Sequence, residues 1–129
     1  MDCFKKNYES IRENREFQLL FRKAESYVTH GFVCYYLKRR QSNSHVNGIE
    51  VSPCNRLGIV ASKKVGNAVK RNRAKRVIRE AFRIAEAQLR KKTDNRYDFV
   101  FVARGKTPCL KSTEIYELIV KGLFKKLLT

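Results

Sequence analysis

The residues of this chain best suited to do chemistry are the basic side chains between Ser62 and Arg83. The run reads Ser-Lys-Lys-Val-Gly-Asn-Ala-Val-Lys-Arg-Asn-Arg-Ala-Lys-Arg-Val-Ile-Arg-Glu-Ala-Phe-Arg, and Glu80 is its single acidic residue. Solvated helix faces usually mix lysine or arginine with acids that pair with them four residues away. The unpaired positive charge therefore predicts an anionic partner, and the planar guanidinium of arginine suits bidentate contact with phosphate.

A helix must position these side chains, because apolar residues recur along the run at steps of three and four. The stripe predicted to face the core is Ala74, Val77, Ile78, Ala81, Phe82, Ala85 and Leu89. About 120° around the same cylinder lies a second stripe. Its members are Asn72, Arg76, Arg79, Arg83 and Arg90, with Arg73 and Lys75 at its margins.

The segment before this helix, Lys63 to Asn67, is predicted to be a strand end and a tight turn. It leads into a helix N-terminus, where free backbone N–H groups attract anions. A nucleotide-binding P-loop is excluded, because no Gly-Lys-Ser/Thr follows Gly66 at the required spacing.

The run from Ser62 to Arg76 resembles the signature segment of the protein subunit of bacterial ribonuclease P. Two further stretches match the same family in order, Phe-Gln-Leu-Leu-Phe at 17–21 and Phe-Val-Cys-Tyr at 32–35. With residues 98–104 and a C-terminal helix, the resemblance covers essentially the whole chain.

The resemblance implies a subunit of an endoribonuclease that removes the 5′ leader of precursor tRNA to give mature tRNA 5′ ends. Hydrolysis would be carried out by a catalytic RNA subunit that requires Mg²⁺, and the protein would bind that RNA and the leader. The turn and helix would hold the catalytic RNA near the cleavage region. The residues expected to do so are Lys63, Lys64, Asn67, Arg71, Asn72, Arg73, Lys75, Arg76 and Arg79.

Aromatic residues near the N-terminus allow two interpretations. Phe17 and Phe21 lie on adjacent turns of a predicted helix capped by Asn14, and such a face usually packs into a core. The family implies instead that Phe17, Phe21 and Tyr35 line a cleft that stacks the single-stranded leader. Tyr36, beside Tyr35, leaves the cleft tyrosine uncertain by one residue.

No constellation of residues typical of a protein active site is found in the sequence. It lacks a nucleophile elbow, His-Glu-x-x-His, Cys-x-x-Cys and paired carboxylates. The cysteines Cys3, Cys34, Cys54 and Cys109 are scattered, which predicts reduced thiols, with Cys34 as a core residue. We therefore expect no catalytic residue, metal or cofactor on this chain.

Composition supports a nucleic-acid partner. The 129 residues carry 29 Lys+Arg against 12 Asp+Glu, a net charge of +17, and such an excess also suits an anionic membrane surface or an acidic protein. No apolar run approaches the ~18 residues of a membrane span, and the N-terminus lacks a signal-peptide core. The predicted location is cytoplasmic, with no membrane partner.

The length predicts one domain over residues 1–129, with a flexible segment at 1–13 and a long loop at 41–55. Hydrophobic periodicity predicts an α+β fold with a small mixed sheet, in the order α-β-β-α-β-α. Strands at 57–62 and 97–103 flank the basic helix and should pair in parallel. The family implies a left-handed crossover between them, against the usual rule.

Two other functions remain open from the residues alone. A basic α+β domain of this size also suits a non-catalytic ribosomal or RNA-chaperone protein. DNA binding is less favoured, because no supporting helix precedes the basic helix.

Overall fold

In the computed structural model, the described residues are 8–11, 13–39, 45–46, 49–50 and 54–128. The predicted flexible segment over 1–13 and the predicted long loop over 41–55 lie largely outside these residues. Within the second segment, β4 (His45–Val46) and β5 (Ile49–Glu50) pair antiparallel.

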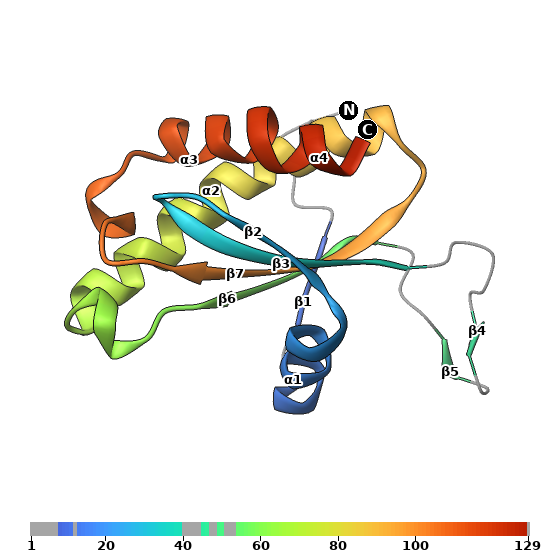
Figure 1. Ribbon diagram of the computed structural model, residues 1–129, viewed down its shortest axis with the longest axis horizontal. Coiled ribbons are helices and arrows are strands. Elements are labelled where there is room, and N and C mark those ends of the chain that lie inside the picture. The colour runs from blue at the N-terminus through green and yellow to red at the C-terminus, as the bar shows by residue number, and fades with distance from the viewer. Residues whose placement is uncertain (1–7, 12, 40–44, 47–48, 51–53, 129) are drawn as a thin grey trace.

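The centre of the molecule is a five-stranded mixed sheet in the order β1-β6-β7-β3-β2 (Figure 1). Its strands are β1 (Glu9–Ser10), β2 (Glu25–Val28), β3 (Phe32–Arg39), β6 (Arg56–Val60) and β7 (Arg96–Ala103). The pairs β1–β6 and β6–β7 are parallel, whereas β3 is antiparallel to both β7 and β2. Nearly every residue of β7 is buried, as the apolar character of both of its faces predicts for a central strand.

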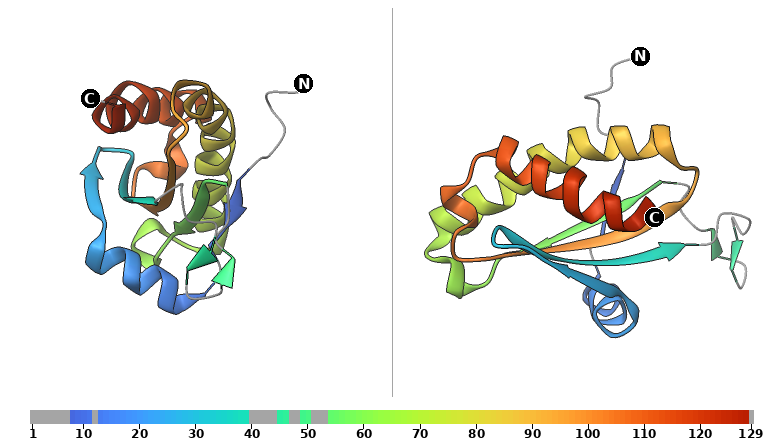
Figure 2. Two further views of the ribbon diagram at one scale, coloured as in Figure 1. Left: turned by 90° about the vertical axis from the view of Figure 1, so that its right-hand side faces the viewer. Right: turned by 45° about the horizontal axis from the view of Figure 1, so that its top comes forward.

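Helices cover the two faces of this sheet unequally. The long helix α2 (Ala68–Lys92) and a C-terminal helix lie together on one face, and the short helix α1 (Asn14–Lys23) lies alone on the other (Figures 1 and 2). The C-terminal helix is made of α3 (Ser112–Leu118), a π-helical stretch (Ile119–Phe124) and α4 (Lys125–Leu128). The face under α1 is therefore only partly covered.

The main core lies between the sheet and α2, and it contains the whole apolar stripe predicted for that helix. Phe82 is completely buried and contacts Phe99 and Phe101 of β7 edge-on, with ring centroids 5.4 and 5.6 Å apart. Cys34 is also buried there, as predicted, and burial raises the pKa of its thiol well above the ordinary value. A smaller cluster of Ile11, Leu20 and Val100 lies under α1.

A buried network of hydrogen bonds lies near the C-terminal end of α2. The carboxylate of Glu86, which is completely buried, accepts hydrogen bonds from Arg90 Nε at 2.8 Å and from Asn55 Nδ2 at 2.8 Å. Asn55 Oδ1 in turn accepts a hydrogen bond from the backbone N–H of Tyr97. These hydrogen bonds satisfy the buried polar groups, and they join α2 to the start of β6 and the start of β7.

The α+β class, the order of the predicted elements and the parallel pairing across α2 are confirmed. The handedness of that crossover stays a prediction. The structure adds β1 and β2, which the sequence did not indicate because they are short edge strands.

Three local predictions were wrong. Asn14 is the first residue of α1 and Glu13 occupies its cap position, while Lys111 takes the cap position predicted for Ser112 or Thr113. Helix α2 continues through Arg90 to Lys92 instead of ending at Leu89, because Arg90 pairs with Glu86 one turn earlier. None of the helices in the described ranges is long and apolar enough to cross a membrane.

Candidate nucleic-acid interface

The start of α2 is built by three capping features in succession. Ser62 Oγ accepts a hydrogen bond from the backbone N–H of Lys64, which begins a 3-10 turn over Lys63–Val65. Gly66 follows with φ of 141°, a conformation that favours glycine. Asn67 Oδ1 then accepts a hydrogen bond from Lys70 N at 3.0 Å, the usual contact of an N-cap. The predicted tight turn is therefore a short 3-10 helix and a glycine.

Basic side chains surround this helix start on the solvent side. The side chains of Lys63, Lys64 and Lys70 are exposed, and the exposed amide of Asn67 lies beside free N–H groups of the first turn. No acidic residue lies in the first turn of α2. The positive end of the helix dipole adds to the lysine charges, so the local field favours an anion.

The predicted basic stripe of α2 is largely exposed, as an interface requires. Asn72, Arg73, Arg76, Arg79 and Arg83 are exposed, and Arg71 and Lys75 are half-buried at the margins. Arg90 departs from the prediction, because its guanidinium is tied to Glu86 and is half-buried. The predicted stripe is thus exposed from Asn72 to Arg83 and does not continue to Arg90.

Arg73 has a structural contact as well as a solvent-facing position. Its Nε donates to the backbone carbonyl oxygen of Pro108 at 2.7 Å and so joins α2 to the short 3-10 helix Thr107–Cys109. A guanidinium has five N–H donors. One is used here, and the other four can donate to phosphate oxygens.

The aromatic residues predicted to form a cleft do meet on the open face of the sheet. The rings of Phe21 and Tyr35 lie edge to face, with centroids 4.9 Å apart. Phe17 lies against β6 at Gly58, where a Cβ atom would come 2.5 Å from Phe17 Cε1. Glycine at position 58 is therefore what allows α1 to approach the sheet closely.

The rings of Phe17, Phe21 and Tyr35 are less buried than the aromatic rings of the main core. Phe21 is 39% exposed, and Phe17 and Tyr35 are half-buried, whereas Phe32, Phe99 and Phe101 in the main core are completely buried. The rest of the surface under α1 is made of partly buried aliphatic residues, Leu37, Val60 and Val102. Aromatic surface that is neither buried nor fully exposed is suited to stack against unpaired bases.

The choice between Tyr35 and Tyr36 is settled by the alternation of β3. Tyr35 packs with the small cluster under α1, whereas Tyr36 points to the main core on the other face and is only 6% exposed. The Tyr36 hydroxyl donates to Glu25 Oε2 at 2.9 Å. Tyr35 is thus the tyrosine of the open face.

An ion-pair group that sequence reasoning missed holds α1 in place. Arg56 of β6 pairs with Glu16 of α1, and its Nη1 lies 3.9 Å from Asp98 Oδ2 of β7. All three side chains are at least partly buried, so solvent screens these pairs less than exposed ones. They fix the position of the helix that carries Phe17 and Phe21. Because Glu16, Arg56 and Asp98 are far apart in the sequence, no spacing pattern indicated that they pair.

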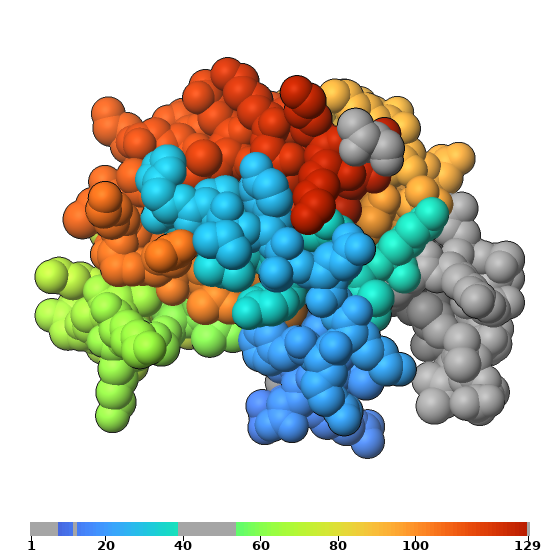
Figure 3. Space-filling model, in the orientation of Figure 1, coloured from blue at the N-terminus to red at the C-terminus, as the bar shows by residue number. Residues whose placement is uncertain are grey.

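The two surfaces belong to different parts of the molecule. Figure 3 shows α1 (blue) and the segment at the start of α2 (green) both projecting at the bottom of the view, with a recess between them. The described residues contain no group of three His, Cys, Asp or Glu that could hold a metal ion.

Comparisons with known proteins agree on one family. Residues 4–128 match the family model described as Ribonuclease P. The "Ribonuclease P protein component" of Bacillus cereus (strain G9842) is 38% identical over 118 residues, covering 92% of this chain and 87% of that protein. The protein of the same description from Exiguobacterium sp. (strain ATCC BAA-1283 / AT1b) is 36% identical over 122 residues, covering 95% and 91%.

Solved structures give the same result. The RNase P protein of Staphylococcus aureus superposes with a TM-score of 0.67 at 28% identity, covering 92% of this chain and 95% of that one. The RNase P protein from Thermotoga maritima superposes with a TM-score of 0.65 at 29% identity, covering 92% and 96%. Fold and sequence therefore point to the same relatives.

Proposed function

The chain belongs to the bacterial ribonuclease P protein family, and from this premise we propose that its two surfaces bind two different RNAs. As the protein component of ribonuclease P, the chain aids removal of the 5′ leader from precursor tRNA. It is a subunit of the endoribonuclease that matures tRNA 5′ ends, and membership of the family implies association with an RNA subunit.

The first proposed surface holds the catalytic RNA. It consists of the 3-10 turn, the first turn of α2 and the exposed side chains of the basic stripe. Its residues are Lys63, Lys64, Asn67, Arg71, Asn72, Arg73, Lys75, Arg76 and Arg79. What supports this proposal is that all of these residues except the half-buried Arg71 and Lys75 are exposed, and that no acidic residue lies in the first turn of α2. Such a surface neutralises phosphates and releases their counterions.

The second proposed surface is the aromatic cleft, which holds the leader of precursor tRNA. The contact between Phe21 and Tyr35 on the half-covered face of the sheet is the observation that carries this proposal. Phe17 extends the aromatic surface over β6. Stacking does not depend on base identity, so one cleft can accept the leaders of many tRNAs.

Together the two surfaces would let the chain aid a cleavage that the RNA subunit carries out. Two RNAs repel each other through their phosphates, and the +17 charge of the chain reduces that repulsion. The aromatic cleft adds affinity that precursor tRNA has and mature tRNA lacks, which favours release of the product. Hydrolysis itself is assigned to the RNA subunit with its Mg²⁺, and a protein that acts on precursor tRNA works in the cytoplasm.

Cleavage assays test this proposal. Precursor tRNA is incubated with the catalytic RNA in low Mg²⁺, with and without the protein, and also with RNA-free protein alone. We expect cleavage by the RNA to rise on addition of protein and no cleavage by the protein alone. Accurate cleavage by RNA-free protein, or no stimulation at any Mg²⁺ concentration, would contradict the proposal.

A further inference from the structure

Thr107 is a completely buried polar residue in the connection between β7 and α3. It is the first residue of the 3-10 helix Thr107–Cys109. Its hydroxyl donates a hydrogen bond to the backbone carbonyl oxygen of Gly31 at 2.6 Å and accepts one from the backbone N–H of Arg104 at 2.8 Å. A buried hydroxyl is tolerated when it is hydrogen-bonded in this way. The side chain of Thr107 therefore joins two segments that are far apart in the sequence.

Further contacts fix the shape of this connection. The backbone N–H of Thr107 donates to the carbonyl oxygen of Arg104 at 3.0 Å, and Arg104 Nη1 donates to the carbonyl oxygen of Thr29 at 3.1 Å. The connection is therefore tied at two points to the turn between β2 and β3. Pro108, which follows Thr107, is also buried, and its ring fixes the backbone φ angle there. The backbone on both sides of Thr107 thus has little freedom to move.

The connection (orange in Figure 1) contacts α2 at Arg73, within the proposed RNA-binding surface. The carbonyl oxygen of Pro108 accepts the hydrogen bond from Arg73 Nε at 2.7 Å, and Arg73 is otherwise exposed. A carbonyl group keeps one direction only while the backbone around it is fixed. The hydrogen bonds of Thr107 therefore act on Arg73 through Pro108.

An arginine held at Nε is oriented for phosphate in a way that a lysine is not. The guanidinium group is planar, so a hydrogen bond at Nε restricts the plane in which the remaining N–H groups lie. Those groups can contact two oxygens of one phosphate, whereas a lysine ammonium is a point charge on a flexible stem. Holding the side chain in advance also lowers the conformational entropy that is lost when RNA binds.

We propose that Thr107 is a positioning residue for RNA binding, which holds the guanidinium of Arg73 ready to contact phosphate through the carbonyl group of Pro108. The inference rests on the proposed function of the α2 surface. It adds to that surface a completely buried residue, which the basic pattern of the sequence does not indicate. The alternative is that the contact between Arg73 and Pro108 only joins α2 to the connection and contributes stability alone.

A double-mutant cycle on the full-length protein separates these two roles. Affinity for the catalytic RNA is measured for wild type, Thr107→Val, Arg73→Ala and the protein with both changes, alongside urea unfolding of each. Valine keeps the shape of threonine and removes its hydroxyl. We expect Thr107→Val to weaken RNA binding about two- to tenfold, the range for ordering one long side chain on binding. It should cause no further loss once Arg73 is replaced by alanine.

Two further variants test the hydroxyl and the guanidinium separately. Thr107→Ser retains the hydroxyl and should bind the catalytic RNA like wild type. Arg73→Lys retains the charge at an exposed position. We expect it to lose affinity by about the same factor as Thr107→Val, with a salt dependence close to that of wild type.

Thr93→Val is the matched control. The same substitution there removes a hydroxyl oxygen that accepts a hydrogen bond from the backbone N–H of Asn95 at 3.1 Å, at the other end of α2 from Arg73. This variant should lose stability and keep the affinity of wild type for the catalytic RNA.

Four results would overturn the inference. The first is the same loss of affinity from Thr107→Val with and without Arg73, and the second is the same loss in Thr93→Val, since either would show a general effect of reduced stability. The third is binding by Thr107→Ser that is as weak as binding by Thr107→Val. The fourth is wild-type affinity in Arg73→Lys, which decides the matter should Thr107→Val not fold, because the orientation of the guanidinium would then have no effect.

Failure of the proposed function gives a different result. If Arg73→Ala alone binds the catalytic RNA as tightly as wild type, the surface that holds this RNA does not include Arg73, and the inference fails with it.

Discussion

Replacing Phe21 by alanine tests leader binding separately from folding stability, because this ring is partly exposed and forms an aromatic pair with Tyr35 on the open face. The centroids of the Phe21 and Tyr35 rings are 4.9 Å apart, and 39% of the Phe21 residue is exposed. We expect Phe21→Ala to weaken binding of precursor tRNA and to leave binding of mature tRNA nearly unchanged. The reason is that the leader is the part of the substrate that mature tRNA lacks.

The expected size of each effect follows from the burial of the ring. Loss of one stacking platform typically costs ~1–3 kcal/mol of single-strand binding, which is about 5- to 150-fold in Kd. A fully buried Phe would cost ~3–5 kcal/mol of folding stability when truncated. Phe21 is far from fully buried and loses one edge-to-face contact, worth ~0.5–1.5 kcal/mol. We therefore expect a loss of stability of about 1–2 kcal/mol and a Tm lower by a few degrees.

The assay measures Kd for precursor and mature tRNA with wild-type and variant complexes, alongside urea unfolding of each protein. Leu19→Ala provides the matched control, because Leu19 lies on the same helix with a similar exposure of 42%, and two positions along a helix place it about 160° around the axis from Phe21. This control should bind both tRNAs like wild type. Equal losses of affinity for the two tRNAs in Phe21→Ala, or unfolding of that variant, would refute the assignment of the cleft.

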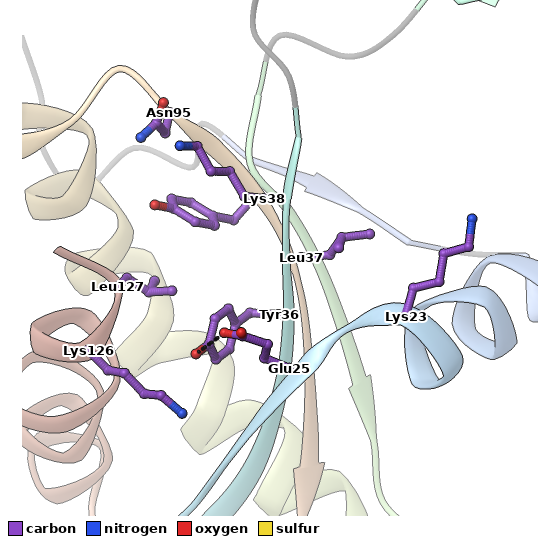
Figure 4. Close-up of a pocket in the computed structure, with 9 residues that line it drawn as sticks. Lys23, Glu25, Tyr36, Leu37, Lys38, Asn95, Lys126 and Leu127 are labelled. Atoms are coloured by element: carbon purple, nitrogen blue, oxygen red, sulfur yellow. Dashed lines mark hydrogen bonds between the residues drawn. The ribbon is translucent and has the colours of Figure 1, made fainter. Parts of the chain in front are cut away.

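Three further predictions test the arginines of α2, the buried network around Glu86 and the hydroxyl of Tyr36. Replacing Arg71, Arg76 and Arg79 by alanine should make the fall of log K with log salt for the catalytic RNA less steep, by about one unit per residue. A folded variant with an unchanged slope would contradict the proposed surface. Glu86→Ala should destabilise the protein toward the lower end of ~3–5 kcal/mol in urea unfolding, because Arg90 can still turn to water; a loss near zero would exclude a structural role for the network. Burial, together with the hydrogen bond that its hydroxyl donates to Glu25 (Figure 4), raises the pKa of Tyr36 in the fold from 10.0 to about 12. Its contribution to stability is therefore complete below pH 10 and is lost as pH rises through about 12. Tyr36→Phe should flatten the fall in stability over that range in alkaline unfolding, and an unchanged fall would show that other groups cause it.

The parts of the fold that could be predicted from the sequence are those with long periodic patterns. The apolar stripe of helix α2 runs from Ala74 to Leu89, about four turns. Strand β7 is apolar on both faces, so both elements were predicted, together with the parallel pairing of β7 with β6. Strands β1 and β2 have two and four residues and mostly exposed side chains. They exist because neighbouring strands offer free backbone groups, which is a property of the assembled sheet and not of the local sequence.

The site was predictable where residue types alone carry the chemistry. Basic residues without acidic neighbours indicated the surface on α2, and the family resemblance indicated Tyr35 as the cleft tyrosine, with Tyr36 as the alternative. The structure alone could decide between them, since the two faces of β3 are both apolar. The Glu16–Arg56 pair depends on a contact between residues far apart in the chain, and no spacing rule anticipates it.

The most direct test of the central claim is to map which RNA each surface contacts in the assembled complex. A photo-reactive side chain is placed at Phe21 in the cleft or at Arg76 on α2, and the crosslinked nucleotides are identified. We expect position 21 to crosslink to the leader of precursor tRNA and position 76 to crosslink to the catalytic RNA. Crosslinks from position 21 to the body of the tRNA or to the catalytic RNA, with none to the leader, would contradict the account.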